Sequence, residues 1–168
     1  MRVSRNAEGG VKVCEEREAT HMSTRVALRP TPSTRADMKK NPLIETYMSP
    51  FAFTIGRDQT IATAHRMMRE YEIRHLPVLD GGRLVGIVSQ RDLHIVESFG
   101  DVDPNKLRVE EAMSVDVFTV TRDTLLVDAV RTMVEKKLGS AVVMEGGKVV
   151  GVFTAIDAQR ALLDLLTH

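Results

Sequence analysis

The chain has 168 residues, 43% of them hydrophobic and 27% charged, with a formal net charge of zero at neutral pH. This composition indicates a globular protein with a packed core, built as one domain or two small ones. No apolar run approaches the roughly 20 residues of a membrane-spanning helix, and an aromatic content of 4% without net positive charge argues against nucleic-acid binding.

The first 40 residues differ in composition from the rest of the chain. They carry more Lys and Arg than Asp and Glu, lack helical or strand periodicity, and include the stretch LRPTPSTRAD. We therefore interpret residues 1–40 as a flexible tail, followed by repeats over residues 41–103 and 104–168. The single cysteine excludes an internal disulfide, and no apolar stretch resembles a secretory signal, so we expect a cytoplasmic location.

The sequence after the tail is duplicated. Residues 48–93 align with residues 113–158 without a gap, so that FTIGRD matches FTVTRD and Gly86 matches Gly151. One such unit of about fifty residues is too small to bury a good core alone. We therefore expect an intramolecular pair with pseudo-twofold symmetry and symmetric clefts where the halves meet.

Each copy predicts the order β-α-β-β-α after a short lead-in helix near NPLIETYM or RVEEAM. Polar stretches, RDQT and TRDT, are expected to cap the first helix of each copy, and glycine pairs are expected to close a hairpin. The predicted strands span residues 51–55, 75–79 and 84–88 in the first copy and 116–120, 140–144 and 149–153 in the second.

These stretches resemble a tandem cystathionine-β-synthase (CBS) domain pair, or Bateman module, over residues 43–166. The resemblance rests on MSPFAFTI and RHLPVLDGGRLVGIVSQRDL in the first copy, and on MSVDVFTV and GSAVVMEGGKVVGVFTAIDA in the second. It implies an α/β (α+β) fold of two β-α-β-β-α repeats packed sheet to sheet. It also implies a regulatory module that binds AMP, ADP, ATP or S-adenosylmethionine and carries no catalysis of its own.

A hydroxyl and a carboxylate recur where the third strand of each copy gives way to its closing helix, as Ser89 with Asp92 and Thr154 with Asp157. These residue types are also preferred helix caps. In a ligand site, the aspartate would accept hydrogen bonds from ribose hydroxyls, and the hydroxyl would donate to phosphate at the helix N-terminus. We favour the ligand interpretation because a cap alone explains neither the spacing nor the repetition as well.

In the family, each cleft joins the signature of one repeat to the early strand of the other, with apolar residues around the adenine. The resemblance implies a first site made by Thr154, Asp157, Ser49, Phe53, Ile73, Arg74 and His75. It implies a second site made by Ser89, Asp92, Ser114, Asp116, Phe118, Leu138, Gly139 and Ser140.

The two sites are not equal, because Arg74 and His75 correspond to Gly139 and Ser140 in the second copy. An arginine fork suits phosphate, and a histidine beside phosphates favours its protonated form, so the first site is expected to take a phosphate chain. Asp116 would repel phosphates, so the second site suits a nucleoside-like or sulfonium ligand, or stands empty. Alternatively, Arg74 and His75 are a surface charge and a polar strand end.

The leading hypothesis is a stand-alone sensor of AMP, ADP or ATP whose ligand-linked conformational change is read by an unidentified effector protein. The alternatives are a ligand-independent dimerisation module and an S-adenosylmethionine sensor. We expect no enzymatic activity, because the sequence has no nucleophile–base pair, Walker loop or Rossmann fingerprint.

Two further expectations concern cofactors and partners. We expect no cofactor and no metal site, because His65 and His94 each lack a second ligand at i+4 on their helix. We also expect a homodimer, assembled through helices that carry Met67, Met68, Met133 and Val134.

Overall fold

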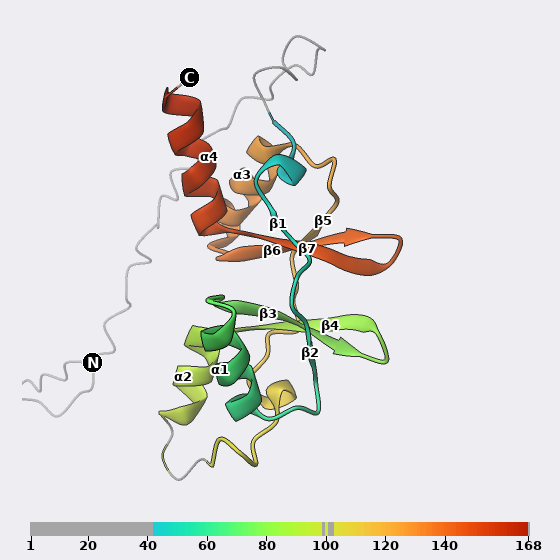
Figure 1. The fold of residues 1–168 in the computed structure, drawn as a ribbon, viewed down its shortest axis with the longest axis vertical. Coiled ribbons are helices and arrows are strands. Elements are labelled where there is room, and N and C mark those ends of the chain that lie inside the picture. Colours follow the sequence, from blue (N-terminus) through green and yellow to red (C-terminus); the bar gives the residue numbers. More distant parts are fainter. Residues whose placement is uncertain (1–41, 99, 101–102, 168) are drawn as a thin grey trace, which may run out of the picture. The chain divides into compact units, whose positions relative to one another are not determined.

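The computed structural model describes residues 42–98, 100 and 103–167, which belong to one compact unit of the chain. The expected tail over residues 1–40 lies outside the described residues. Within the described part, no helix is long and apolar enough to cross a membrane. The structure therefore covers the duplicated part of the sequence (Figure 1).

The described elements follow the predicted order in both copies. The first repeat contains β2 (Ile55–Gly56), α1 (Ile61–Glu70), β3 (His75–Asp80), β4 (Arg83–Ser89) and α2 (Gln90–Glu97). The second repeat contains β5 (Thr119–Val120), α3 (Leu126–Lys136), β6 (Ser140–Glu145), β7 (Lys148–Thr154) and α4 (Ala155–Thr167). Gly81 and Gly82 close the first hairpin at φ angles of +54° and +81°, which glycine adopts without strain.

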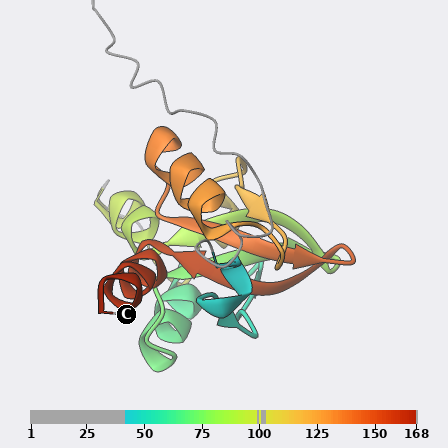
Figure 2. The same ribbon diagram turned by 90° about the horizontal axis from the view of Figure 1, so that it is seen from above.

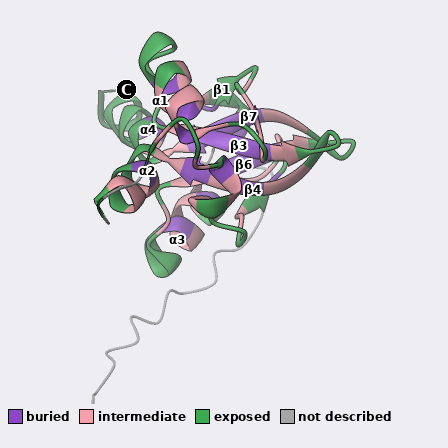
Figure 3. Ribbon diagram, turned by 90° about the horizontal axis from the view of Figure 1, so that it is seen from below, coloured by how far each residue is buried: buried purple, intermediate pink, exposed green. Residues whose placement is uncertain are grey.

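The two repeats share one sheet topology. In each, the strands of the hairpin are antiparallel, and the short early strand pairs parallel with the first of them, as β2 with β3 and β5 with β6. Buried residues gather on the strands and on the sheet-facing sides of the helices (Figure 3). The two hairpins lie one above the other in Figure 1 and overlap in the view from above (Figure 2), as the predicted sheet-to-sheet packing requires.

The early strands are shorter than the predicted ranges 51–55 and 116–120. Phe51 has a φ angle of +59°, which is left-handed and interrupts an extended chain. Before this break, Ser49–Pro50 form a separate strand, β1. The lead-in helices are single 3-10 turns, η1 (Ile44–Thr46) and η2 (Val109–Glu111).

The capping prediction is correct for the first repeat and wrong for the second. The Thr60 Oγ1 atom accepts a hydrogen bond of 3.3 Å from the Thr63 amide at the start of α1. The N-cap of α3 is instead Leu125, which has no side-chain acceptor. Thr124 lies one residue too early and accepts a turn hydrogen bond of 3.0 Å from the Thr121 amide.

Each repeat is completed by the segment that leads into the other one. Ile44, in η1, is fully buried in the core of the second repeat, and Val109, in η2, is fully buried in the core of the first. Strand β1 pairs antiparallel with β7, and Ser114 forms the equivalent bridge with Ile87. This exchange enlarges both hydrophobic cores. A single repeat would be too small to bury a good core by itself.

The matched glycines Gly86 and Gly151 lie where the exchanged segments cross the hairpins. A Cβ atom on Gly151 would lie 2.8 Å from the Ser49 carbonyl oxygen, and one on Gly86 would lie 2.6 Å from the Met113 sulfur. No side chain fits at that separation without a shift of its neighbour. The crossing therefore gives a physical reason for the glycine at the same place in both copies.

The helix residues expected at a dimer interface are only partly available. Met68 and Met133 are 4% and 5% exposed and belong to the two cores, and Met67 packs beside the first core. Val134 is 71% exposed. Of these four positions, Val134 alone presents a largely exposed side chain.

Candidate functional site

The first hydroxyl–carboxylate corner, Ser89 with Asp92, lies where β4 meets α2. The Ser89 amide and hydroxyl both donate to Asp92 Oδ2, over 2.8 Å and 2.7 Å. The Asp92 amide donates back to Ser89 Oγ over 3.3 Å. This reciprocal arrangement is a capping box, which holds the carboxylate in a fixed direction at the helix N-terminus.

The second corner, Thr154 with Asp157, repeats the two hydrogen bonds to the carboxylate where β7 meets α4. The Thr154 amide and hydroxyl donate to Asp157 Oδ2 over 2.9 Å and 2.8 Å. The Asp157 side chain is nearly fully buried, and its second oxygen, Oδ1, accepts a 3.0 Å hydrogen bond from Arg160 Nη1. Both corners thus use one carboxylate oxygen to hold the strand end.

The second carboxylate oxygen distinguishes the corners. In Asp157 it faces the Arg160 guanidinium, whose side chain is 69% exposed. Among the described residues, no group donates a hydrogen bond to Asp92 Oδ1, and Asp92 is only partly buried. An incoming hydroxyl would therefore find an open acceptor at Asp92, whereas at Asp157 it would compete with a solvated arginine.

His75 lies between the two corners. It stands opposite Ser89 in the β3–β4 register, and its Nε2 atom lies 3.4 Å from where a Cβ atom on Gly139 would stand. The Gly139 carbonyl in turn accepts a 3.0 Å hydrogen bond from the amide of Ala155, the first residue of α4. His75 therefore contacts the first repeat through its strand and approaches the second through its ring.

Burial lowers the pKa of His75 below its ordinary value, and the positive charges of Arg74 and Arg91 lower it further. The carboxylate of Asp92 opposes this shift without cancelling it. These effects together favour the neutral form of the His75 imidazole. The protonated imidazole that the sequence predicts beside phosphates would therefore form only when an anion is bound near His75.

Ser49 and Ser114, on the early segments, lie beside the strands of their expected corners. Ser49 pairs with Val152, two residues before Thr154, and Ser114 pairs with Ile87, two residues before Ser89. The structure thus brings each early segment to the signature strand of the other repeat. Ser140, which is predicted for the second site, instead lies directly opposite Thr154 of the first corner in the β6–β7 register.

The remaining predicted site residues have mixed surroundings. The Ile73 and Leu138 amides close the ends of α1 and α3 by donating to Met68 and Met133, over 2.9 Å and 2.8 Å, and both side chains pack beside a core. Phe118 is also partly buried there. Phe53, Arg74 and Asp116 are exposed. Phe53 stacks on Tyr71 with ring centroids 3.8 Å apart, so its ring already has an aromatic partner.

Two hollows in the described part lie away from the corners. One of about 700 Å³ surrounds the first hairpin turn and is lined by charged residues that include Arg57, Asp80 and Glu110. One of about 410 Å³ lies along β5 and the start of α3, and Phe118 is the only predicted site residue in its lining. Arg57 pairs with both Glu110 and Asp80 across the first hollow. These charged groups are paired with one another, which suits a structural role.

Sequence reasoning missed a cluster of His65, His94 and Glu97 on α1 and α2. Spacing along one helix does not reveal these three residues, because they come from two helices that pack together. The i, i+3 spacing of His94 and Glu97 on one helix was the only local signal available.

The fold is a paired-repeat module of two facing β-α-β-β-α repeats that exchange their lead-in segments. At each strand–helix corner, a carboxylate accepts hydrogen bonds from the end of the strand. The chain belongs to the CBS domain family, whose model matches residues 44–96 and 109–164. This confirms the resemblance on which the sequence interpretation was based.

Known proteins similar to the chain include an enzyme and two CBS structures with ligands. An inosine-5'-monophosphate dehydrogenase of Korarchaeum cryptofilum is 32% identical over 114 residues, covering 67% of this chain but only 23% of that enzyme. The CBS domain pair of MJ0100, in complex with 5'-methylthioadenosine and S-adenosyl-L-methionine, is 25% identical with a TM-score of 0.67. CBSX2 in complex with AMP is 27% identical with a TM-score of 0.64. Each similarity to these two structures covers 74% of this chain and 98% of the other.

Proposed function

We propose that this chain is a regulatory module that binds AMP, ADP or ATP and transmits binding through a conformational change. The observation that carries the proposal is the pair of corners, each beside a segment supplied by the other repeat. The MJ0100 and CBSX2 structures, with adenosine-containing ligands, support this class of ligand.

The chemistry of the corners suits a nucleotide. The Asp157 Oδ2 atom holds the strand end, so Oδ1 would accept from the ribose hydroxyls. Arg160 would have to release this oxygen, and the ribose hydroxyls would take over its hydrogen bond to the buried carboxylate. Phosphates would lie at the N-terminus of α4, near the ring of His75 and with Arg74 next to it in sequence.

A nucleotide bound at Asp157 and His75 would join the two repeats. Occupancy would then favour the arrangement in which the second-repeat carboxylate and the first-repeat imidazole are close together. A ligand shifts a conformational equilibrium only by its difference in affinity for the two states, and a ligand that bridges the repeats has that difference. The Ser89–Asp92 corner, with its open Oδ1 atom, is proposed as the second site.

Calorimetric titration with AMP, ADP, ATP, adenosine and S-adenosylmethionine tests the proposal. At a 100-fold excess over its Kd, a ligand adds about 2.7 kcal/mol of stability, which raises Tm by roughly 5–10 °C for a chain of this size. Asp157→Ala should weaken every adenosine ligand, and Arg74→Ala should weaken ATP and ADP more than adenosine. Asp92→Ala should leave this binding event mostly intact.

Asp128→Ala is the matched control, because Asp128 also lies in the first turn of a helix and pairs with an arginine at i+3. It should lose a little stability and no affinity. If Asp92→Ala abolishes nucleotide binding while Asp157→Ala does not, the two sites are reversed. If neither substitution changes the affinity of the protein for any of these ligands, the two carboxylates are helix caps only.

One observation favours a second function, ligand-independent dimerisation. Helix α4 exposes a set of large apolar side chains, at 39–74% of their area: Ile156, Leu162, Leu163, Leu165 and Leu166. A contiguous apolar surface of this kind commonly marks an interface. We propose that it contributes to a homodimer, and a dimer whose stability ignores every adenosine ligand would favour this function over sensing.

A further inference from the structure

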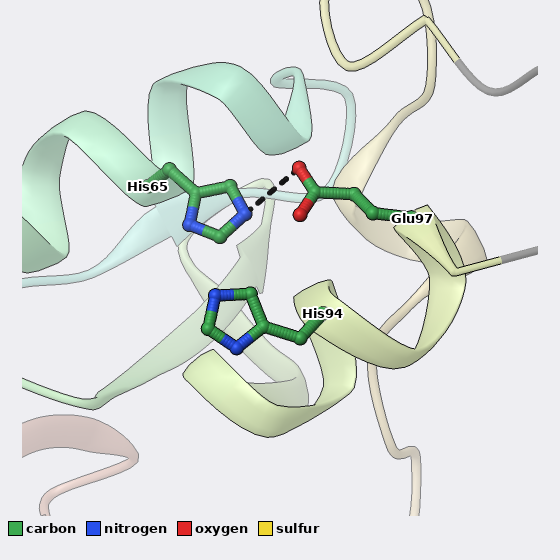
Figure 4. Close-up of side chains that lie close together, drawn as sticks. All are labelled: His65, His94 and Glu97. Atoms are coloured by element: carbon green, nitrogen blue, oxygen red, sulfur yellow. Dashed lines mark ion pairs between the residues drawn. The ribbon is translucent and has the colours of Figure 1, made fainter.

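We propose that His65, His94 and Glu97 form a binding site for a transition-metal dication of the zinc class. His65 projects from α1, and His94 and Glu97 project from α2 toward it (Figure 4). Each residue offers one ligand atom, and these atoms all lie within 4.8 Å of one another. The site lies on the helices of the first repeat and does not depend on nucleotide binding.

The distances are close to those that a metal ion requires. Zinc binds imidazole nitrogen and carboxylate oxygen at about 2.0–2.2 Å, which places tetrahedral ligand atoms about 3.3 Å apart. His65 Nε2 already lies 3.0 Å from Glu97 Oε1, and the two imidazole rings have centroids 5.5 Å apart. Small side-chain rotations of the exposed His94 would complete the set.

The Nε2 atom of His65 is a buried polar atom whose hydrogen bonding is not satisfied by the described residues. It makes no hydrogen bond with any of the described residues, although the Glu97 carboxylate lies at ion-pair distance. Buried polar atoms without a hydrogen bond are uncommon and call for an explanation. A cation between the nitrogen and the carboxylate would satisfy both atoms.

The charge of the site also favours a cation. Glu97 is the last residue of α2, where the helix dipole is negative and a carboxylate is unfavourable. Two imidazoles and one carboxylate form a three-ligand set that leaves a fourth position for water, as in open zinc sites. This mixed nitrogen and oxygen set suits zinc better than calcium or magnesium, which prefer oxygen ligands.

The second repeat shows that the cluster is not a by-product of the duplication. The positions equivalent to His65, His94 and Glu97 are Val130, Gln159 and Leu162, which cannot form such a site. The three ligands are therefore specific to the first repeat. A metal ion would clamp α1 to α2, whose first turn carries Asp92.

The test uses the full-length protein, stripped with a chelator and titrated with zinc chloride against a chromophoric chelator. We expect one equivalent of zinc per chain. His65→Gln and His94→Gln should each lower the affinity by about tenfold or more, a loss typical of a disrupted metal site. The isosteric Glu97→Gln should do so with the least effect on folding, and circular dichroism confirms the fold of each variant.

Matched controls separate this site from other zinc ligands of the chain. His75→Gln removes a histidine of the same repeat outside the cluster, and a Cys14→Ser, His21→Gln double variant removes ligands outside the described residues. Both should bind zinc as the parent does, and cobalt should give the absorption bands of a tetrahedral site only where the cluster is intact. Absence of zinc binding, or full binding by the His65→Gln, His94→Gln double variant, would overturn the proposal.

Discussion

Replacing Gly151 by alanine should destabilise the fold more than the same change at the equivalent Gly86. A Cβ atom on Gly151 would lie 2.8 Å from the carbonyl oxygen of Ser49 and 3.1 Å from the sulfur of Met48. That carbonyl belongs to β1, which is held in register with β7, so the backbone itself must move. At Gly86 the nearest atom is the Met113 sulfur at 2.6 Å, which can turn away, and the equivalent carbonyl oxygen, that of Ser114, is further off at 3.0 Å.

The magnitude follows from the cost of overpacking. Forcing an extra carbon into a packed site costs typically about 1–3 kcal/mol. For a chain of this length, the Tm of Gly151→Ala should fall by roughly 2–12 °C, at about 2–4 °C per kcal/mol. Gly86→Ala should lie nearer the lower end of that range, because its closest contact is a flexible side chain and its backbone contact is longer than at Gly151.

Thermal and urea unfolding of the two variants measure this difference. Gly139→Ala is the control, because its Cβ atom would meet only the His75 ring, at an ordinary contact distance of 3.4 Å. Glycine-to-alanine changes at unstrained sites stabilise a protein by about 0.4–1 kcal/mol through the unfolded state. A Gly151→Ala protein as stable as Gly139→Ala would show that β1 does not press against β7, and the described exchange would be refuted.

The other predictions concern pH, assembly and the tail. Burial lowers the folded-state pKa of His75 below its usual 6.5. As the pH falls through 6.5, the unfolded chain therefore binds more protons than the folded chain, and the free energy of unfolding decreases. His75→Gln should reduce this pH dependence in urea titrations. Phosphate binding near His75 should also take up a proton, seen as a buffer-dependent heat in calorimetry between pH 6 and 7. Light scattering should give a dimer for the parent and a chain mass near 18.7 kDa for a Leu163→Glu, Leu166→Glu variant, and a dimeric variant would exclude α4 from the interface. Removing residues 1–37 should leave the cooperative unfolding transition in place, and a large fall in Tm would show that the tail packs on the fold.

The repeated elements could be predicted from the sequence because their signals are local. Apolar spacing marks α1 and α3, and glycine pairs mark both hairpin turns, so the order β-α-β-β-α needs no tertiary information. The exchange of lead-in segments left no such signal, because β1 has only two residues and η1 only three. The burial of Ile44 in the opposite repeat is set by the packing of distant segments, which no periodicity encodes.

The candidate sites show the same division between local and distant information. The Ser89–Asp92 and Thr154–Asp157 corners were visible because their partners are three residues apart. The place of His75 between the corners depends on how the two sheets face each other, and the His65 cluster depends on the packing of α1 against α2. Exposed leucines on α4 were also not foreseen, because an apolar stripe does not say whether its partner is in the same chain.

The cap and ligand interpretations of the corners are compatible, because a carboxylate has two oxygens and the cap uses one. In Asp157 the strand end occupies Oδ2, which fixes the direction of Oδ1. Asp157→Asn keeps one oxygen to accept the cap bonds but turns an amide donor toward the position of the ribose hydroxyls. It should therefore retain most of the stability that Asp157→Ala loses, about 1 kcal/mol for a cap, and still lose nucleotide affinity. If Asp157→Asn binds nucleotide as the parent does, the carboxylate serves the helix alone and the proposed ribose contact is wrong.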